Sequence, residues 1–175
     1  MRKIMNATHK TTDDQRQGAL DSIRLGALAG AAGGLAEIAW VSLYAFASDT
    51  SPALVARGVT TAAGVSALLP ADAVTLGVGV HMGIAVMLGI ALAFVWRAMS
   101  ASRNVNPFSF MAAALTGVWA INFFVVLPIV SPAFLTLLPY SVSLVSKLAF
   151  GMAAAGALQL FAVPAGALHA ARIRL

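Results

Sequence analysis

The stretch at residues 25–47, LGALAGAAGGLAEIAWVSLYAFA, decides the fold, and Glu37 is its one charged residue. A helix rises 1.5 Å per residue, so about 20 apolar residues cross a bilayer core of about 30 Å. The stretch therefore predicts a membrane-spanning helix. Its end, Ala45-Phe46-Ala47, also resembles a signal-peptidase site. The apolar region of a signal peptide is only about 7–15 residues long, so we expect an uncleaved helix.

Three further apolar stretches predict three more spans, at residues 74–96, 108–127 and 140–163. The whole chain of 175 residues is 60% hydrophobic and 10% charged, whereas a soluble domain carries about 25% charged residues. This composition excludes an ordinary soluble enzyme or binding module. The runs are continuous and rich in Ala and Leu, whereas barrel strands are about 10 residues long and alternate. We therefore predict an all-α integral membrane four-helix bundle.

The basic residues predict how the spans are oriented. Of the 11 Lys and Arg residues, nine lie in the polar segment 1–24, in the connection between the second and third spans, or in the tail 171–175. Cytoplasmic segments of membrane proteins carry an excess of Lys and Arg. We therefore expect both termini in the cytoplasm, residues 1–24 as a flexible or surface-lying arm, and residues 25–170 as the transmembrane domain. The same distribution accounts for the net charge of +5 without a nucleic-acid partner.

The two predicted outer connections resemble each other. The first contains SPA at residues 51–53 and LLP at residues 68–70, and the second contains SPA at residues 131–133 and LLP at residues 137–139. A tryptophan precedes the proline of each SPA by 12 or 13 residues. We predict two related helical hairpins, related by an axis along the membrane normal. The alternative is that these tripeptides recur by chance. The first connection is also long enough for a short interfacial helix within residues 52–69.

Small residues recur at four-residue spacing in three of the spans. Such rows let helix backbones approach closely in lipid, where no hydrophobic effect brings helices together. The expected packing residues are Gly26, Gly30 and Gly34 in the first span, Gly77 and Gly89 in the second, and Gly151 in the fourth.

The same three spans each contain one acidic or basic residue at a similar depth: Glu37, His81 and Lys147. Counted from the predicted outer ends, they lie roughly 10–15 Å into the membrane, with Asn122 of the third span slightly above. An isolated charge there costs several kcal/mol. We therefore expect Glu37 and Lys147 to pair, directly or through His81 or water. The alternative is that Lys147 extends outward to the interface while Glu37 is protonated.

The leading functional expectation is a non-enzymatic accessory or self-associating subunit of a membrane assembly. Its partners would be the lipid bilayer and other membrane subunits or a second copy, and the polar layer would only hold the helices together. No nucleophile elbow, phosphate loop, HExxH motif or paired carboxylates occur, so no catalytic residue is assigned. The second expectation is a small transporter or proton-linked channel that uses the polar layer.

A third alternative is a haem- or copper-binding subunit with His81 as a ligand. Only one histidine lies inside a predicted span, and cysteine is absent. Lys147, in the same layer, would repel a cation. We therefore predict no metal site, and the sequence assigns no cofactor, with haem or copper at His81 as the alternative.

Two motifs carry a resemblance to known proteins. LLPYSVSLVSKLAFG at residues 137–151, together with the single histidine in VGVHMGIAVMLG at residues 78–89, resembles a group of uncharacterised small inner-membrane proteins of bacteria. The resemblance extends over residues 25–163. It implies a four-helix fold and a location in a bacterial inner membrane, and it implies no activity and no site residues.

Overall fold

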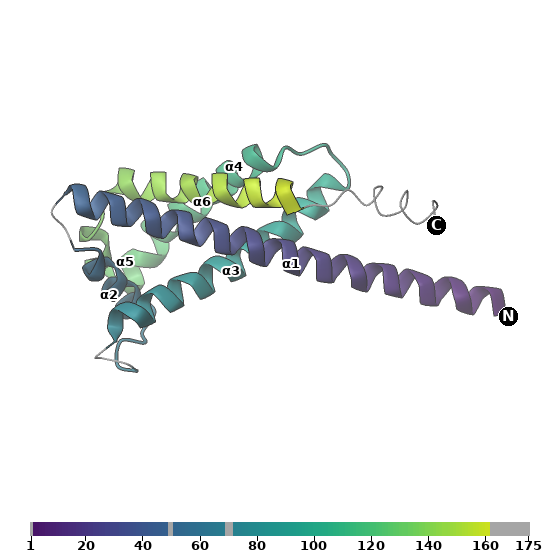
Figure 1. Cartoon of the computed structure of the whole chain (residues 1–175), viewed down its shortest axis with the longest axis horizontal. Helices are drawn as coiled ribbons and strands as arrows, with labels where there is room; N and C mark the ends of the chain where they lie inside the picture. The colour runs from purple at the N-terminus through teal and green to yellow at the C-terminus, as the bar shows by residue number, and fades with distance from the viewer. Residues whose placement is uncertain (1, 49–50, 69–71, 162–175) are drawn as a thin grey trace.

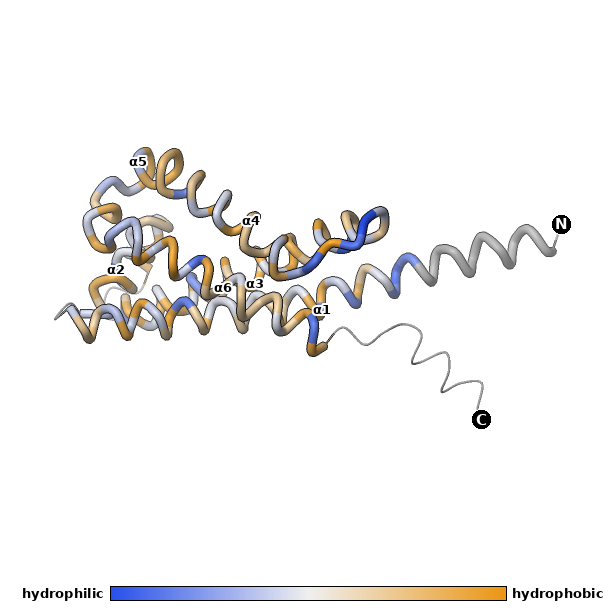
Figure 2. Tube along the Cα trace, turned by 90° about the horizontal axis from the view of Figure 1, so that it is seen from above, coloured by the Kyte–Doolittle hydropathy of each residue, from blue (hydrophilic) through white to orange (hydrophobic). Residues whose placement is uncertain are grey.

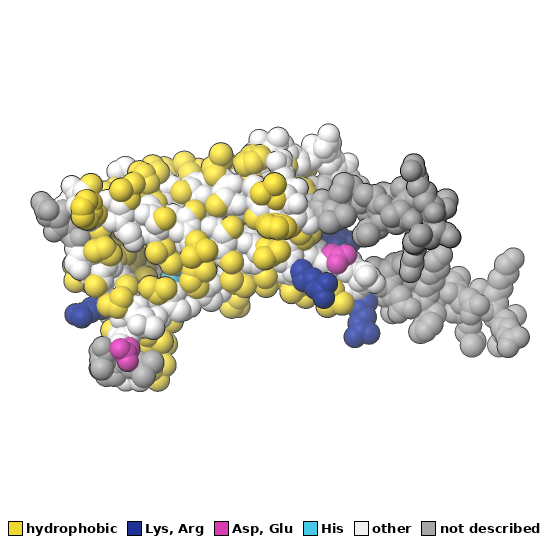
Figure 3. Space-filling view, in the orientation of Figure 1, with side chains coloured by type: hydrophobic (Ala, Val, Ile, Leu, Met, Phe, Trp, Pro, Cys, Tyr) yellow, Lys and Arg dark blue, Asp and Glu magenta, His cyan; other side chains and the backbone are white. Residues whose placement is uncertain are grey.

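The computed structural model describes residues 2–48, 51–68 and 72–161, with side chains from residue 15 onward. Four described segments are long and apolar enough to span a membrane: Gln15–Ala47, Ala73–Ser100, Pro107–Val130 and Tyr140–Phe161. Hydrophobic side chains cover the middle of the molecular face in Figure 3, and charged side chains gather toward its two ends. The expectation of an all-helical chain with four apolar spans is confirmed, and the orientation of the termini stays a prediction.

The first helix, α1 (Arg2–Ala47), is much longer than the predicted span (Figure 1). Residues 2–24, for which the sequence predicts a flexible or surface-lying arm, continue the helix. Starting a helix is costly and extending one is not, so a span readily continues into a neighbouring segment that lacks proline. The α3 helix (Ala73–Ser100) supports this extension, because its Arg97 Nη1 donates hydrogen bonds to the Gly18 carbonyl and, at 3.0 Å, to Ser22 Oγ.

Both connections that were expected on the outer side contain short helical elements. In the first, α2 (Pro52–Ala62) confirms a short helix. It ends before residue 69 because Gly64 takes a φ of 70°, a conformation that glycine adopts without steric cost. The third span, α4 (Pro107–Ile121), continues through a π-helical turn, η1 (Asn122–Val126), into α5 (Leu127–Val130). The second connection then contains a 3₁₀ turn, η2 (Pro132–Thr136), which leads to α6 (Tyr140–Phe161).

The four long segments form a row and not a closed ring. The α1 helix packs against α3 and also against α6, and α6 packs in turn against α4, whereas α3 and α4 hardly touch. Figures 1 and 2 show α6 lying along α1, while α3 and α4 diverge from this central pair. The order α3–α1–α6–α4 therefore leaves one side of the bundle open between its two outer helices.

This order bears on the predicted pair of hairpins. Each hairpin packs within itself, α1 with α3 and α4 with α6. Both SPA sequences begin a short helical element, with their prolines at the start of α2 and η2. A two-fold axis along the membrane normal would exchange α1 with α4 and α3 with α6. The two helices at the centre of the row are α1 and α6, and such an axis would not exchange them. The second hairpin is therefore placed beside the first by a shift along the row and not by a two-fold rotation. The duplication itself stays a prediction.

The bundle has two unlike halves. In the closed half, near the α3–α4 connection, helix backbones touch: a Cβ on Gly26 would lie 2.5 Å from the Ile90 Cα, and one on Gly30 would overlap the Ala85 carbonyl. A Cβ on Gly89 would likewise overlap the backbones of Gly26 and Gly30. In the open half, which contains α2 and η2, α3 moves away from α1 and α2 packs against α3.

The other predicted packing glycines divide among different neighbours. Gly34 continues the α1–α3 contact, since a Cβ there would lie 2.8 Å from the Ala85 Cβ. Gly151 faces the Leu115 side chain of α4. Gly77 also lies at a close helix contact, but its partner is the Ala56 backbone of α2, so the row of small residues on α3 contacts two different helices. The α3 helix has already left α1 at that level.

Candidate functional site

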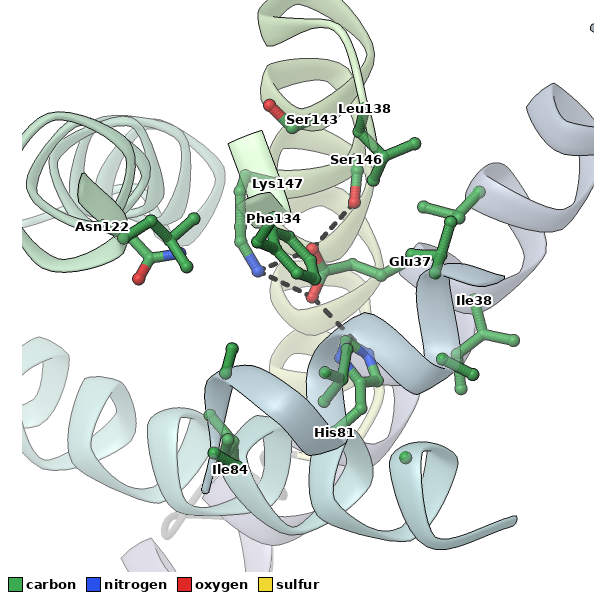
Figure 4. A pocket seen from close by; sticks show the side chains of 18 of the residues that line it. Glu37, Ile38, His81, Ile84, Asn122, Phe134, Leu138, Ser143, Ser146 and Lys147 are labelled. Carbon is green, nitrogen blue, oxygen red and sulfur yellow. Dashed lines mark hydrogen bonds and ion pairs between the residues drawn. The ribbon is translucent and has the colours of Figure 1, made fainter. Parts of the chain in front are cut away.

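The carboxylate of Glu37, on α1, is enclosed by side chains from two other helices, α6 and α3. Lys147 Nζ of α6 lies 2.7 Å from Oε1 and 3.0 Å from Oε2, so it bridges both carboxylate oxygens. Ser146, also on α6, donates a hydrogen bond of 2.8 Å from its Oγ to Oε1. The side chain of Glu37 is only 5% exposed. The ion pair expected between the first and fourth spans is therefore present, and Figure 4 shows its contacts as dashed lines.

His81 completes this group from α3. Its Nε2 lies 3.8 Å from Glu37 Oε2 and 3.4 Å from the backbone carbonyl oxygen of Gly34. Both neighbours are hydrogen-bond acceptors, so a proton on Nε2 would have a partner within the bundle. We call Glu37, His81, Ser146 and Lys147 the polar cluster.

Electrostatics explains why the cluster takes this form. A buried charge must be paired and hydrogen-bonded to be tolerated away from water. Both oxygens of Glu37 have a partner, and the pair carries no net charge. In the hydrocarbon region this arrangement is far less costly than either charge alone.

Ser146 is the member of the cluster that the sequence analysis missed. Serine is common in apolar helices, so its presence at position 146 indicates nothing by itself. The available signal was its place directly before Lys147, because neighbours on a helix differ by about 100° and both can reach one large partner.

A cavity of about 610 Å³ extends from the polar cluster toward the α2 end of the bundle. Aliphatic and aromatic side chains form most of its wall. Glu37, His81 and Lys147 are the titratable side chains among the described residues that line it. Exposed lining residues lie on α3 (Val78 and Ile84), at the end of α4 and in its continuation (Ile121, Val126 and Val130), and at the two ends of α2 (Pro52 and Ala63). The mouth of the cavity therefore lies on the side where the row of helices is open between α3 and α4, next to α2.

Asn122 lines the same cavity from the opposite side and begins the π-helical turn. Within the described part of the chain, its side chain has no hydrogen bond. The expectation that Asn122 joins Glu37, His81 and Lys147 is therefore wrong. Figure 4 places it across the cavity from Lys147. A π-helical turn inside an α-helix is rare and often lies at a functional site.

Aromatic side chains hold the π-helical turn against the start of α6. Phe123 and Phe124 both contact Trp119 and Tyr140, with ring centroids 5.5–5.8 Å apart. The Trp119 indole also donates a 2.9 Å hydrogen bond to Ser143 Oγ. On the other side of α6, Trp40 of α1 donates a 3.0 Å hydrogen bond to the Val142 carbonyl. The tryptophans of the two predicted hairpins therefore bind neighbouring positions of one helix.

The metal and haem alternative fits these residues poorly. Nε2 of His81 faces two hydrogen-bond acceptors, and the Lys147 ammonium occupies the nearest carboxylate. Among the described residues there is no group of three or more His, Asp or Glu side chains that would hold a metal ion.

No protein-family model, no curated protein and no solved structure matches this chain.

Proposed function

We propose that this chain is a non-enzymatic membrane protein that binds a small membrane-soluble molecule in the cavity, as the binding unit of a small carrier. The observation that supports this proposal is that all four residues of the polar cluster line the cavity. The side chains of Lys147 and His81 remain 20% and 24% exposed, and both line the cavity.

The size and lining of the cavity agree with a binding role. Small-molecule sites are typically clefts of about 300–1,000 Å³, mostly apolar, with a few polar groups that orient the ligand. Intramembrane ionisable groups often mark such sites.

A proton-linked channel has less support. Toward the closed half, the described core beyond the cluster is apolar and fully buried at Met111, Leu115 and Phe150. Glycine contacts bring the α1 and α3 backbones together at the same level. This arrangement favours a site that is reached from one side over a continuous polar path.

The test compares two tryptophan substitutions on α3 that lie three residues apart. Ile84 is 57% exposed and lines the cavity, whereas Met87 is 72% exposed and does not line it. Wild-type protein should be purified gently and extracted, and small molecules retained above the bulk lipid background should be quantified by mass spectrometry. We expect Ile84→Trp to lower the retained molecule at least about tenfold, or about 1.4 kcal/mol of binding free energy, and Met87→Trp to leave it unchanged.

Equal retention in both variants, or no retained molecule in the wild type, would contradict the proposal. The accessory-subunit function expected from the sequence would instead give stoichiometric co-purification of a larger membrane protein.

A further inference from the structure

The cavity presents hydrogen-bond donors where its ligand would meet the polar cluster. Glu37 uses both carboxylate oxygens within the cluster and is 5% exposed. Lys147 is more exposed than Glu37, and its ammonium has three protons for the two oxygens that it bridges. A molecule in the cavity therefore meets the Lys147 ammonium before it meets the carboxylate, which favours a head group that accepts hydrogen bonds.

The charge balance of the lining favours a neutral head group. The charges of Glu37 and Lys147 cancel, and no other Asp, Glu, Lys or Arg lines the cavity among the described residues. An anionic head group would leave one negative charge uncompensated in a site of low polarity, at a cost of several kcal/mol. A cationic head group would also face the Lys147 ammonium directly.

Asn122 supplies a second polar contact on the opposite wall. Its amide lines the cavity, and its side chain makes no hydrogen bond with any described residue. The primary amide can donate and accept, so it can bind a carbonyl or hydroxyl group that Lys147 reaches from the other side. Two facing polar groups would fix the orientation of a small polar head.

The mouth of the cavity favours an apolar tail. Its rim consists of exposed aliphatic side chains such as Ile84, Ile121 and Val126, on segments long and apolar enough to span a membrane. A hydrocarbon tail can pass through this lateral opening while the head stays at Lys147.

We infer that the cavity binds a membrane-dissolved molecule with a neutral carbonyl head and a hydrocarbon tail, with the head between Lys147 and Asn122. This inference rests on the proposed binding function. An isoprenoid quinone and a neutral ester lipid share this chemistry.

The experiment uses the full chain in detergent and native mass spectrometry with three probes of equal tail length: a long-chain methyl ketone, a fatty acid and an alkyl amine. We expect the ketone to bind at least about tenfold more tightly than the other two. Asn122→Leu should weaken ketone binding about tenfold without lowering the unfolding temperature. Thr116→Val is the matched control on α4, because the Thr116 hydroxyl bonds to the Ala112 carbonyl of its own helix and Thr116 is not among the described residues that line the cavity.

Competition with a long-chain quinone and with a neutral diglyceride then distinguishes the two sources, and displacement of the ketone by either supports the inference. Tighter binding of the acid or the amine would overturn the inference and leave the proposed function standing. Ketone binding that is unaffected by Asn122→Leu would also overturn it. If no probe binds, and Ile84→Trp and the wild type retain the same molecules, both proposals fail.

Discussion

The closed and open halves of this bundle hold their helices together by different contacts. In the closed half, α1 and α3 touch through glycine, and the contacts are backbone against backbone at Gly26, Gly30 and Gly89. In the open half the same two helices separate, and charged side chains such as Glu37 and Lys147 connect α1 to α6 instead. Close packing leaves no space for a ligand, and separated helices need polar contacts to stay in register. The cavity lies where the second arrangement replaces the first.

The largest expected effect concerns the charges of the open half. Lys147→Met leaves the enclosed Glu37 carboxylate without its counter-ion, and we expect a loss of about 3 kcal/mol in the free energy of unfolding. SDS titration in mixed micelles measures this quantity. Glu37→Gln should cost less, because the Lys147 side chain is partly exposed and its long stem can move the ammonium outward.

The double variant Glu37→Gln/Lys147→Met serves as the control for this prediction. It should recover a large part of the stability lost in Lys147→Met, because no isolated charge remains. If the two single effects simply add, the pair does not hold α1 to α6, and the contrast between the two halves is wrong.

The closed half is tested with two alanine substitutions on the same helix. A Cβ on Gly89 would overlap the α1 backbone, whereas the Cβ of Gly83 would meet no atom within 4 Å. We expect Gly89→Ala to lower the free energy of unfolding by about 2 kcal/mol through overpacking. Gly83→Ala should be neutral or stabilising by about 0.5 kcal/mol, because alanine favours the helix. Similar unfolding midpoints for both variants would show that close backbone contact does not distinguish this half.

The smallest expected effect concerns the hydrogen bonds that hold the start of α6. Trp119→Phe removes the bond to Ser143 Oγ and keeps an aromatic ring beside the π-helical turn. Hydrogen bonds within membranes contribute about 0.6 kcal/mol on average, so we expect a loss of about 1 kcal/mol or less. Trp96→Phe is the matched control, because its indole bonds to the nearby Val105 carbonyl and not to α6. A larger loss in the control than in Trp119→Phe would mean that the tryptophan contacts do not stabilise the open half.

Several features of the site could be predicted from single residues and their depth. Glu37 and Lys147 are opposite charges in apolar segments, and the cost of isolating either one predicts that they meet. Glycines at four-residue spacing similarly predict close helix contact at Gly26 and Gly30. These predictions depend on residue type and on distance along a helix, which the sequence states directly.

Other features could not be predicted because they depend on which helix lies beside which. The contact of Gly33 with the Phe150 ring requires α6 to lie along α1, and the contact of Gly77 with Ala56 requires α2 to fold back onto α3. The π-helical turn at residues 122–126 has no reliable sequence signal. It places Asn122 on the wall of the cavity and not within the polar cluster.

The sequence by itself determined that the chain is helical, that four segments can cross a membrane, and that an acid and an amine share one depth. These properties follow from local hydropathy and from the regular rise of a helix. The tertiary structure alone decided the order α3–α1–α6–α4, the open side between α3 and α4, and the cavity that Lys147 lines. Helix order depends on how closely distant backbones can approach, and that is a property of pairs of surfaces and not of any one segment.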